Sequence, residues 1–515
     1  MPNLKDIEIN PQFALALEVM EHTRKSAFVT GKAGTGKSTL LEYFRSITNK
    51  KIVVLAPTGV AALNVKGQTI HSFFKFKPNI TLDKIRKAKR SDKSSIYRQL
   101  ETIVIDEISM VRSDLLDCID KFLRLNGKDR SRPFGGAQMI FIGDLYQLPP
   151  VVTREEKGIF AGLYKSQYFF DALVMEHFLM EYIELEKIYR QKDTTFIEIL
   201  NAFRNKSAGI KHVEAINQRY APDFTPGRDE YIICLTTTNA MAMDINQREL
   251  DRIKGEPKIF IAEIDGAVEK KNIPTEEKLA LKNGAQVMML NNDPQERWVN
   301  GTLGRISVIT KDSVLVEFAN GKIEEVTPFT WEIFNFSFNQ ETNSLSSDIV
   351  GTFTQLPLKL AWAVTIHKSQ GLTFDKVIID IGKGTFAHGQ LYVALSRCRT
   401  LGGMVLKKRI AAHHAIMDYK VRDFVTRYQY RISEENCSTD EKLSIIKAAI
   451  KDKKILEITY LKANDEKSKR RLSPITAGQM EYKDKSYLGM EAFCHLRKEK
   501  RVFRVDRILD IKTED

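Results

Sequence analysis

The stretch Ala27–Phe44, AFVTGKAGTGKSTLLEYF, joins a short apolar strand pattern to a glycine-rich loop and then to a helical pattern. Within it, Gly31-x-x-x-x-Gly36-Lys37-Ser38 has the spacing of a P-loop, with the strand before it and the helix after it that such a loop requires. Backbone N–H groups of a glycine-rich turn surround phosphates, and the positive end of the helix dipole adds to the attraction. A chance glycine loop rarely has both neighbours, so the stretch predicts a bound nucleoside triphosphate.

Two side chains of this loop have roles that follow from their position. Lys37 is expected to reach the β- and γ-phosphates, and the Ser38 hydroxyl is expected to ligate a magnesium ion. The predicted nucleotide contacts of the loop are Gly34, Thr35, Gly36, Lys37, Ser38 and Thr39. Because kinases, switches, pumps and motors all use such loops, the loop alone does not say how the nucleotide is used.

Length and composition indicate a globular protein of several domains. The chain has 515 residues, of which 43% are hydrophobic and 28% charged, and this balance separates it from disordered chains. No run reaches the roughly 18–20 apolar residues of a membrane span, and the N-terminus lacks a signal-peptide pattern. The five cysteines are scattered without a CxxC pair, which favours a reducing cytoplasm over a zinc site or a disulfide framework. The net charge of +13 favours a polyanionic partner, although basic charge also keeps many proteins soluble.

Short β-branched runs alternate with segments of helical periodicity, which is typical of parallel α/β sheets. These units are too many for one domain, and they fall into two groups, before and after residue 170. The strand patterns cover 52–57, 102–107, 139–144, 231–239, 376–381 and 403–408, and the clearest helical patterns cover 113–125 and 194–205.

The order of these patterns predicts a division into domains. From 254 to 350 the sequence changes to short strands and glycine turns, which is typical of a small β-barrel inserted into the second α/β domain. Residues 431–442 are polar and are expected to form a linker. The predicted parts are a first α/β domain (1–170) with its own insertion (64–98), a second α/β domain (171–253 and 351–430), the barrel (254–350), the linker (431–442) and a terminal module (443–515).

Polar residues at two strand ends indicate hydrolysis. Asp106 and Glu107 end the strand pattern TIVIDE, where one carboxylate can hold magnesium and its neighbour can polarise an attacking water. Such a pair is common by itself, but after a P-loop it favours hydrolysis over phosphoryl transfer to a small molecule. Gln147, in MIFIGDLYQLPPV, is expected to sense the γ-phosphate, with an amide that caps a turn as the alternative.

Two arginines of the second group of patterns are candidates for transition-state stabilisation. Arg190 lies in LEKIYRQ and Arg397 in VALSRCR, and both segments are compact and partly apolar. A surface arginine is usually only a solvated charge. If the two α/β domains face each other across the nucleotide, however, both arginines can neutralise charge that develops on the phosphates, and hydrolysis then depends on closure of the cleft.

Eight segments follow one another along the chain: GKAGTGKST, LAPTGVAALNVKGQTIHSFF, IDEISMV, GDLYQLPPV, LEKIYRQ, LTTTNAMAMDIN, AVTIHKSQGLTFDKVIID and GQLYVALSRCRT. In this order they resemble the motif series of superfamily 1B helicases, specifically the Pif-one (Pif1) family of DNA helicases, over residues 8–425. The resemblance implies an ATP-dependent 5′→3′ DNA helicase that uses ATP and Mg²⁺. It also implies two RecA-like domains, with a small wedge inserted in the first and an SH3-like barrel in the second.

Carried over residue by residue, the resemblance gives Lys37, Ser38, Asp106, Glu107, Gln147, Arg190 and Arg397 the roles argued above. It adds Gly371 to the nucleotide site, and it implies a glutamine near the N-terminus that reads adenine. Gln12 is the candidate for that glutamine, and Asn10 is the alternative. The implied partners are single-stranded DNA and duplex, forked or G-quadruplex DNA, bound by a monomeric motor.

Candidate DNA contacts lie in one segment of each α/β domain. In the first, a strand ends in a turn whose Thr58 hydroxyl and backbone amides can contact phosphate, and His71 and Phe73 can stack on bases or hydrogen-bond the strand. In the second, AVTIHKSQG matches the segment of the family that couples DNA to ATP, although the same cluster could be an ordinary helix start. The predicted contacts are Pro57, Thr58, Gly59, His71, Phe73, Thr365, His367, Lys368 and Ser369.

The strongly basic run from Phe73 to Arg98 is expected to form the wedge and a wall of the DNA groove, with a solvated surface as the alternative. Its contacts would go mainly to phosphate, so affinity should fall with salt. In the inserted barrel, Trp298 is expected to be a packing residue rather than a base-stacking one.

The terminal module resembles a WYL domain, because it contains Tyr487-Leu488 and a later RVFRVDRI, with Ser486 in place of the tryptophan. It is basic, and Arg501 and Arg504 are candidate nucleic-acid contacts, while a regulatory ligand or a solvated packing module are the alternatives. WYL domains are mostly bacterial, so a bacterial, cytoplasmic and nucleoid-associated protein is expected.

Two other classes of function remain to be compared with a motor. A nucleotide-dependent switch could hold nucleic acid without unwinding it, but it needs no hydrolytic residues such as Glu107 and the two arginines. A small-molecule kinase does not need a second RecA-like domain. The sequence therefore favours a DNA-translocating ATPase.

Overall fold

The computed structural model describes residues 8–77, 80–88, 94–152, 163–191, 193–227, 230–266, 273–339, 344–462, 467–482 and 485–514. The chain divides into two compact units. The first comprises Met1–Arg204 and Ala208–Ile416, and the second comprises Asn205–Ser207 and Met417–Asp515. Among the described residues, no helix has both the length and the apolar character needed to cross a bilayer.

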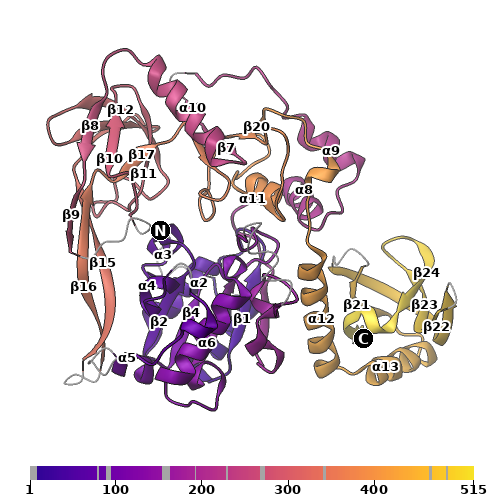
Figure 1. Ribbon diagram of the computed structural model, residues 1–515. Coiled ribbons are helices and arrows are strands. Elements are labelled where there is room, and N and C mark those ends of the chain that lie inside the picture. The colour runs from indigo at the N-terminus through magenta and orange to yellow at the C-terminus, as the bar shows by residue number, and fades with distance from the viewer. Residues whose placement is uncertain are drawn as a thin grey trace. The chain divides into compact units, whose positions relative to one another are not determined.

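The first core of the large unit is built on a six-stranded parallel sheet (Figure 1). Its strands, in sheet order, are β3 (Gln68–Thr69), β2 (Ile52–Ala56), β4 (Thr102–Ile105), β5 (Gln138–Gly143), β1 (Ala27–Gly31) and β6 (Glu181–Leu185). Every residue of the three central strands β4, β5 and β1 is buried, as expected for a parallel sheet covered on both faces. The sheet includes β6, so the first core continues beyond the predicted boundary at residue 170.

Helices of this core follow its strands in the order expected for α/β units. They are α1 (Pro11–Leu17), α2 (Lys37–Ile47), α3 (Gly59–Asn64), α4 (Ile70–Phe74), α5 (Ser94–Gln99) and α6 (Ser113–Asn126). One apolar face of α1 and α2, which includes Phe13, Leu40 and Phe44, packs on the sheet and is almost fully buried. Because the strands are parallel, the loops after β1, β2, β4 and β5 all lie at one edge of the sheet, where ligands of such folds bind.

The second core has a four-stranded parallel sheet. Its strands, in sheet order, are β18 (Ala363–Thr365), β7 (Ile233–Thr236), β19 (Val377–Asp380) and β20 (Met404–Leu406), and its main helices are α8 (Thr194–Arg204), α9 (Ile210–Asn217), α10 (Asn239–Arg252) and α11 (Gln390–Ser396). Helices α8 and α11 pack against each other within one apolar cluster of the unit. The strands and helices predicted from sequence for both cores are therefore confirmed.

An antiparallel sheet is inserted between β7 and β18. Its strands, in sheet order, are β14 (Ile323–Val326), β13 (Val314–Phe318), β12 (Leu303–Ile309), β11 (Gln286–Met289) and β17 (Leu358–Leu360), and a hairpin of β8 (Lys258–Ile261) and β10 (Lys278–Leu281) adds to the same apolar cluster. Trp298 packs in this cluster against Phe318, and its indole Nε1 donates to Asn291 at 2.9 Å, so it is a packing residue as predicted. The inserted strands continue to Leu360, beyond the predicted end at 350, and the SH3-like assignment stays a prediction.

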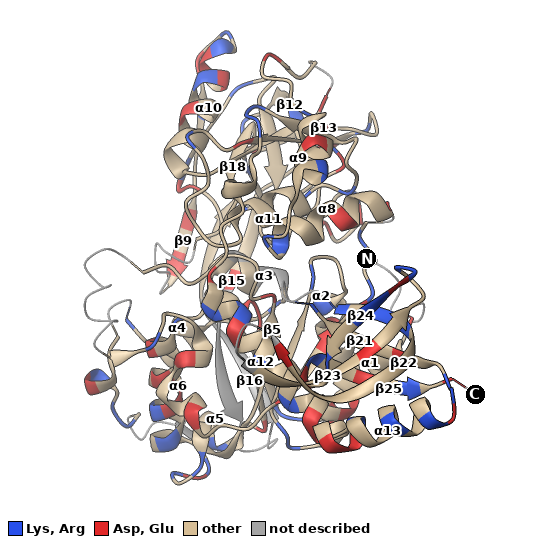
Figure 2. Ribbon diagram, turned by 90° about the vertical axis from the view of Figure 1, so that its right-hand side faces the viewer, with Lys and Arg blue, Asp and Glu red and all other residues tan. Residues whose placement is uncertain are grey.

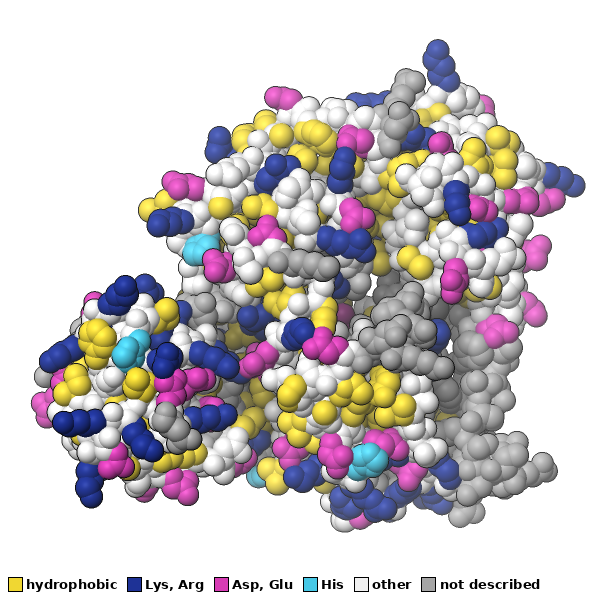
Figure 3. Space-filling model, turned by 180° about the vertical axis from the view of Figure 1, so that it is seen from behind, with side chains coloured by type: hydrophobic (Ala, Val, Ile, Leu, Met, Phe, Trp, Pro, Cys, Tyr) yellow, Lys and Arg dark blue, Asp and Glu magenta, His cyan; other side chains and the backbone are white. Residues whose placement is uncertain are grey.

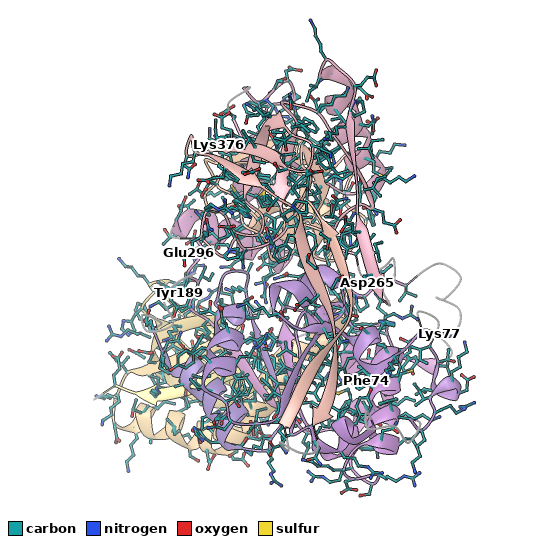
Figure 4. All side chains as sticks on the ribbon, turned by 90° about the vertical axis from the view of Figure 1, so that its left-hand side faces the viewer. Phe74, Lys77, Tyr189, Asp265, Glu296 and Lys376 are labelled. Carbon is teal, nitrogen blue, oxygen red and sulfur yellow. The ribbon has the colours of Figure 1, made fainter. Side chains whose placement is uncertain are left out.

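Two long strands extend from the inserted sheet along the first core (Figure 1). They are β15 (Phe329–Asn339) and β16 (Ser344–Gln355), with β9 (Glu263–Gly266) paired to β16. Strand β15 packs against α4 and α5, and Figure 4 shows Phe74 of α4 beside this hairpin. These two helices lie within the predicted wedge, of which residues 78–79 and 89–93 are outside the described residues.

In its described residues, the small unit has two α-helices and a five-stranded antiparallel sheet. They are α12 (Tyr419–Asn436), α13 (Thr439–Lys451) and, in sheet order, β24 (Glu499–Arg504), β23 (Lys485–Cys494), β22 (Lys467–Tyr482), β21 (Leu456–Leu461) and β25 (Ile508–Thr513). The predicted linker 431–442 is wrong, because α12 continues to Asn436 and α13 begins soon after. Ser438 and Glu441 form a reciprocal capping box at the start of α13, so the polar composition of this range reflects helix capping rather than a flexible connection.

Candidate nucleotide site and nucleic-acid interface

The P-loop connects β1 to α2 at the ligand-binding edge of the first sheet. Gly34 and Gly36 have φ values of +83° and +89°, which favour glycine, and a Cβ on Gly34 would lie 2.5 Å from the Cβ of Arg190. The Lys37 ammonium donates to the carbonyl oxygens of Gly31 at 2.8 Å and Lys32 at 3.1 Å. Burial lowers the pKa of Lys37, while the nearby carboxylates oppose that shift. The loop therefore holds a buried cation inside a ring of backbone groups, as a phosphate site requires.

The other predicted residues of this loop lie around the same turn. Thr35 is buried, and its hydroxyl donates to the Lys32 carbonyl oxygen at 2.9 Å, so this side chain stabilises the loop. Ser38 is exposed and Thr39 half-buried in the first turn of α2. Both residues are therefore at least partly accessible at the start of α2.

Asp106 and Glu107 directly follow β4, on the loop beside the P-loop. Asp106 is 8% exposed, and burial together with the Glu107 charge raises its pKa to about 7. Burial also raises the pKa of Glu107, which Lys37 and Arg397 oppose. Glu107 has a left-handed backbone with φ of +49°, a conformation that costs energy for a residue with a side chain and is most frequent at functional sites. Asp106 is buried and Glu107 half-buried, and two such carboxylates side by side favour the presence of a cation.

Gln147 lies on the loop after β5 and is connected to the second core. The side-chain amide of Gln370, from the second core, donates to Glu107 Oε2 at 2.9 Å and to Gln147 Oε1 at 3.3 Å. Both glutamines are buried, with exposed fractions of 5% for Gln147 and 8% for Gln370. The sequence reasoning missed Gln370, although it follows the predicted Ser369 directly.

The two predicted arginines come together on the side of the second core. Arg190 donates to the carbonyl oxygen of Ser396 at 3.4 Å, and Ser396 directly precedes Arg397 in the chain. Arg397 is 1% exposed, and its guanidinium donates to the carbonyl oxygens of Val393 at 3.0 Å and Leu372 at 3.1 Å. Burial and the Arg190 charge lower the pKa of Arg397 to about 9, against the attraction of Glu107. Both cations therefore lie within electrostatic reach of the predicted catalytic carboxylate.

The start of α1 lies beside the P-loop. Asn10 caps α1 by accepting from the Phe13 N–H at 2.9 Å, and its amide donates to the Tyr189 hydroxyl at 3.0 Å. Tyr189 in turn donates its backbone N–H to the Gly34 carbonyl oxygen at 2.8 Å, and its ring lies near Gly36. Gln12 is half-exposed in the first turn of α1. Tyr189, labelled in Figure 4, is an exposed aromatic side chain at this site that the sequence reasoning did not single out.

The turn after β2 presents predicted DNA contacts of the first core. Thr58 is exposed, and its hydroxyl accepts from the Ala61 N–H at 3.2 Å at the start of α3. His71 is half-exposed on α4, whereas Phe73 is only 2% exposed and packs edge to face on Phe74. A base-stacking role for Phe73 is therefore wrong, because the helical repeat of α4 turns this ring into the core.

The segment after β18 contributes two exposed and two buried residues. His367 is half-exposed and Lys368 is exposed, but Thr365 and Ser369 are 4% and 0% exposed. The Ser369 hydroxyl donates to the Ile366 carbonyl oxygen at 2.8 Å, and the Thr365 hydroxyl accepts from the Lys368 N–H at 3.3 Å. The side chains of Thr365 and Ser369 therefore shape this turn and cannot contact DNA without a change in structure.

The remaining glycines and proline of the prediction shape these turns. Gly371 is exposed with φ of +84°, directly after the Gln370 that bridges the two cores. Pro57 and Gly59 are half-buried and flank Thr58.

A hollow of ≈ 590 Å³ opens at the carboxyl end of the second sheet, after β7 and β19. Thr237, Thr238, Met241, Lys383, Phe386 and Lys408 are among the residues that line it. Phe386 is 62% exposed, which is unusual for a large aromatic side chain. The hollow lies at the same sheet edge as the turn that carries His367 and Lys368. The sequence reasoning missed it, because its residues come from three separate segments, 237–241, 380–386 and the neighbourhood of Lys408.

Two parallel α/β cores, with a P-loop on the first and arginines of the second beside it, define an ATPase built from two RecA-like domains. Residues 12–212 match the PIF1-like helicase family, and residues 360–405 match the UvrD-like helicase C-terminal domain. A curated relative from Bdellovibrio bacteriovorus, named ATP-dependent DNA helicase Pif1, is 33% identical over 414 residues, which cover 78% of this chain and 88% of that protein. The chain belongs to the PIF1-like helicase family and is an ATP-dependent DNA helicase.

Other relatives and solved structures agree with this assignment. The human ATP-dependent DNA helicase PIF1 is 34% identical over 74% of this chain, which spans 58% of the human protein. A crystal structure of Bacteroides sp Pif1 in complex with ADP-AlF4 covers 83% of this chain at 35% identity with a TM-score of 0.75, and 98% of that structure is matched. The Bacteroides Pif1 structure bound to ssDNA covers 83% of this chain and 98% of its own at 37% identity, with a TM-score of 0.63. Residues 441–513 match the WYL domain family.

Proposed function

We propose that this chain hydrolyses ATP between its two RecA-like cores and uses the resulting closure and opening to step 5′→3′ along single-stranded DNA. The observation that carries the proposal is the Gln370 amide, which reaches from the DNA-facing segment of the second core to both Glu107 and Gln147 of the first. One side chain thus connects the predicted catalytic carboxylate, the predicted γ-phosphate sensor and the segment next to Lys368. The relatives named ATP-dependent DNA helicase support the helicase activity, and the 5′→3′ direction of movement follows from the family alone.

The roles in hydrolysis follow from burial and charge. Lys37 binds the β- and γ-phosphates in place of the loop carbonyl oxygens that it contacts without nucleotide. Glu107 is the general base, because a carboxylate whose pKa is raised by burial accepts a proton more readily than an exposed one. Arg190 and Arg397 stabilise the charge that develops in the transition state. Arg397 must exchange its carbonyl partners for phosphate oxygens, so it acts only when the cleft closes.

Magnesium fits the residues present. The exposed Ser38 hydroxyl and the buried Asp106 carboxylate are oxygen donors, which Mg²⁺ prefers, and a P-loop ion takes its remaining ligands from phosphates and water. Bound there, the ion would neutralise phosphate charge as a Lewis acid. The pair of adjacent carboxylates, which burial disfavours in the ionised state, is the feature that supports a cation at this position.

Adenine is proposed to bind at the start of α1. Tyr189 offers an exposed ring beside Gly36, and Gln12 or Asn10 offers the amide that reads the edge of the base. Because the Asn10 side chain already caps α1 and contacts Tyr189, Gln12 is the better candidate.

Single-stranded DNA is proposed to cross the carboxyl edges of both sheets. Thr58 and His71 contact it on the first core, and His367 and Lys368 on the second. The hollow beside β7 extends this path, because Phe386 can stack on a base while Lys383 and Lys408 bind phosphates. Duplex, forked and G-quadruplex DNA are proposed as the structures that this motor, as a monomer, separates.

The WYL module is proposed to bind nucleic acid or a regulatory ligand. Lys and Arg are present on α13, β24 and β25 (Figure 2) and spread over the face of the module on the left of Figure 3. Arg504 pairs with Asp506 at 2.6 Å and Arg501 with Glu499 at 3.4 Å, so both arginines must share their charge with a carboxylate. We also propose that the whole protein is cytoplasmic and associated with the nucleoid.

The test combines two measurements on the full chain with ATP and Mg²⁺. The ATPase rate is measured with and without single-stranded DNA, and strand displacement is measured on duplexes with a 5′ or a 3′ overhang. We expect strong stimulation by DNA and displacement only from the 5′ overhang. An ATPase indifferent to DNA would contradict the motor and favour a nucleotide-dependent binding protein, and displacement from the 3′ overhang would reverse the polarity.

A further inference from the structure

An ion pair between Asp144 and Arg204 lies in the interior of the large unit. Asp144 follows β5 on the first core, and Arg204 ends α8 on the second. Arg204 Nη2 donates to Asp144 Oδ1 at 3.1 Å, with 8% of the Arg204 side chain and none of the Asp144 side chain exposed. An ion pair removed from water to this degree is costly unless its geometry is fixed, so the two cores are held in one relative position here.

Asp144 is also the centre of the loop that carries Gln147. Its Oδ1 accepts the Tyr146 backbone N–H at 3.1 Å, and its Oδ2 lies 3.4 Å from the Gln147 amide nitrogen. The Arg204 guanidinium stacks over the Tyr146 ring, 3.8 Å from its centre. Arg204 therefore contacts this loop twice, once through charge and once through the ring.

A tyrosine of the second core joins the same carboxylate to the P-loop. The Tyr392 hydroxyl accepts the Ala33 backbone N–H at 2.9 Å and lies 3.4 Å from Asp144 Oδ2. Tyr392 is on α11, which packs against the α8 that ends at Arg204. A movement of the second core relative to the first thus moves Arg204 and Tyr392 together, and both act on Asp144.

We propose that Arg204 is a positioning residue for ATP hydrolysis, which acts through Asp144 and fixes it, and with it the Gln147 loop, when the two cores close. The inference rests on the proposed hydrolysis between the two cores. Arg204 lies outside the eight motif segments and is 60 positions from Asp144 in the sequence.

The charges around Asp144 give the physical reason. Burial would raise the pKa of Asp144, but Arg204 and then Lys37 lower it. Without Arg204, Lys37 is the next cation in strength, so the buried carboxylate would compete with the phosphates for the P-loop lysine. Arg204 therefore both orients the Gln147 loop and leaves Lys37 to the nucleotide.

The test uses four variants of the full chain. Arg204→Met removes the charge, Arg204→Lys keeps it, and Asp144→Asn combined with Arg204→Met removes both charges, so no buried charge is left unpaired. Arg252→Met is the matched control, because Arg252 also ends a helix and pairs with a carboxylate, Glu249, but with 68% of its side chain exposed. Each protein is measured for thermal midpoint, for affinity of a fluorescent ADP analogue, and for kcat and KM of the ATPase with single-stranded DNA.

We expect Arg204→Met to lower kcat by about ten- to a hundredfold, the size of effect that a misplaced catalytic group causes, and to raise KM for ATP by a smaller factor, because Asp144 then competes with the phosphates for Lys37. Arg204→Lys should recover part of kcat. The double variant should recover the thermal midpoint, because it leaves no unpaired buried charge. It should not recover kcat, because the ion pair that positions the Gln147 loop is still missing. Arg252→Met should match the wild type.

Two results would overturn the inference: Arg204→Met with kcat within twofold of the wild type, or a double variant that regains kcat together with its thermal midpoint. If Arg204→Met does not fold, Arg204→Lys and the double variant decide, because the first should be the more active. A wild-type ATPase that DNA does not stimulate would contradict the proposed function itself, whereas equal rates of wild type and Arg204→Met contradict only the role of Arg204.

Discussion

Gln370 of the second core donates its side-chain amide to Glu107 of the first core at 2.9 Å. This hydrogen bond to the predicted general base favours the ionised form of Glu107. The side-chain carbonyl oxygen of Gln370 is buried and has no hydrogen-bond partner among the described residues. This oxygen is therefore available to accept a hydrogen bond from a group that arrives with the substrate. A water between Glu107 and Gln147 would satisfy it by donating a hydrogen bond.

Glu107→Gln tests the base directly. The substitution keeps the size of the side chain and its contact with Gln370, so ATP should still bind, while hydrolysis should fall by about a hundredfold or more because the general base is lost. Single-turnover hydrolysis and binding of a fluorescent nucleotide separate the two effects. Loss of binding in parallel with hydrolysis would assign Glu107 to nucleotide binding instead.

Lys37→Ala should abolish ATP hydrolysis and weaken ATP binding, because the buried ammonium is the cation of the phosphate site. Lys25→Ala is the matched control, since Lys25 precedes β1 but is 68% exposed and pairs with Glu181 on the surface. Both proteins should bind single-stranded DNA with similar affinity. A Lys37→Ala protein with undiminished DNA-dependent ATPase would show that the triphosphate is hydrolysed elsewhere.

Burial patterns explain why the strands were predictable. The runs that become β2, β4, β5, β7 and β19 are continuous and apolar because parallel strands are covered on both faces. Strand β6, which completes the first sheet, has only two buried residues in its pattern EYIEL. Because its apolar pattern is weaker than that of the other strands, the end of the first domain was predicted too early, at residue 170. Local sequence also contained the Ser438–Glu441 capping box, which was interpreted as part of a linker.

The site was predictable only where a residue lies in a motif. Lys37, Asp106 and Gln147 each follow a strand of one sheet, so their meeting at one edge follows from strand order. The pair Asp144–Arg204 joins two domains, and no local pattern relates its members. Phe73 shows the opposite error, because it was predicted to contact DNA from its place beside His71 in the segment GQTIHSFF, while the repeat of α4 buries it.

The Asp106–Glu107 pair predicts a pH dependence of stability in the absence of nucleotide and metal. The folded state raises the pKa of Asp106 to about 7 from its ordinary value of 3.8, so Asp106 retains a proton that the unfolded chain has lost. The stability from this proton is complete below pH 3.8 and is lost as the pH rises through 7. Asp106→Asn should therefore raise the thermal midpoint more at pH 8 than at pH 5.

The same pair predicts the acid limb of the ATPase profile. Asp106 must be ionised to hold magnesium, so activity should fall as the pH drops below about 7, and more magnesium should move this limb to lower pH because the ion competes with the proton. The measurement is the ATPase rate from pH 5.5 to 8.5 at two magnesium concentrations. A limb that magnesium does not move would assign the titration to another group.

Alanine substitutions of Phe73 and His71 should have different effects, although both residues lie on α4. Phe73→Ala should lower the free energy of unfolding by about 3–5 kcal/mol, because it empties a buried aromatic cluster. His71→Ala should change the unfolding free energy little and weaken binding of single-stranded DNA. Chemical denaturation and fluorescence anisotropy with a labelled oligonucleotide measure the two effects, and a Phe73→Ala protein of normal stability and weak DNA binding would restore the stacking role.

Phe386 and Lys408 test the hollow beside β7 as part of the DNA path. Phe386→Ala should weaken binding of single-stranded DNA by roughly 1–3 kcal/mol, the value of one stacked base, and Phe386→Leu should weaken it as well, because leucine keeps the apolar bulk without the aromatic face. Lys408→Ala should weaken binding for all sequences and reduce the slope of log affinity against log salt by about 0.7, as the loss of one phosphate contact on a single strand does. Lys376→Ala is the matched control, since Lys376 is an exposed lysine of the same core that pairs with Glu230 at 2.8 Å and does not line the hollow. Normal affinity and an unchanged salt slope in both Phe386→Ala and Lys408→Ala would place the strand elsewhere on the second core.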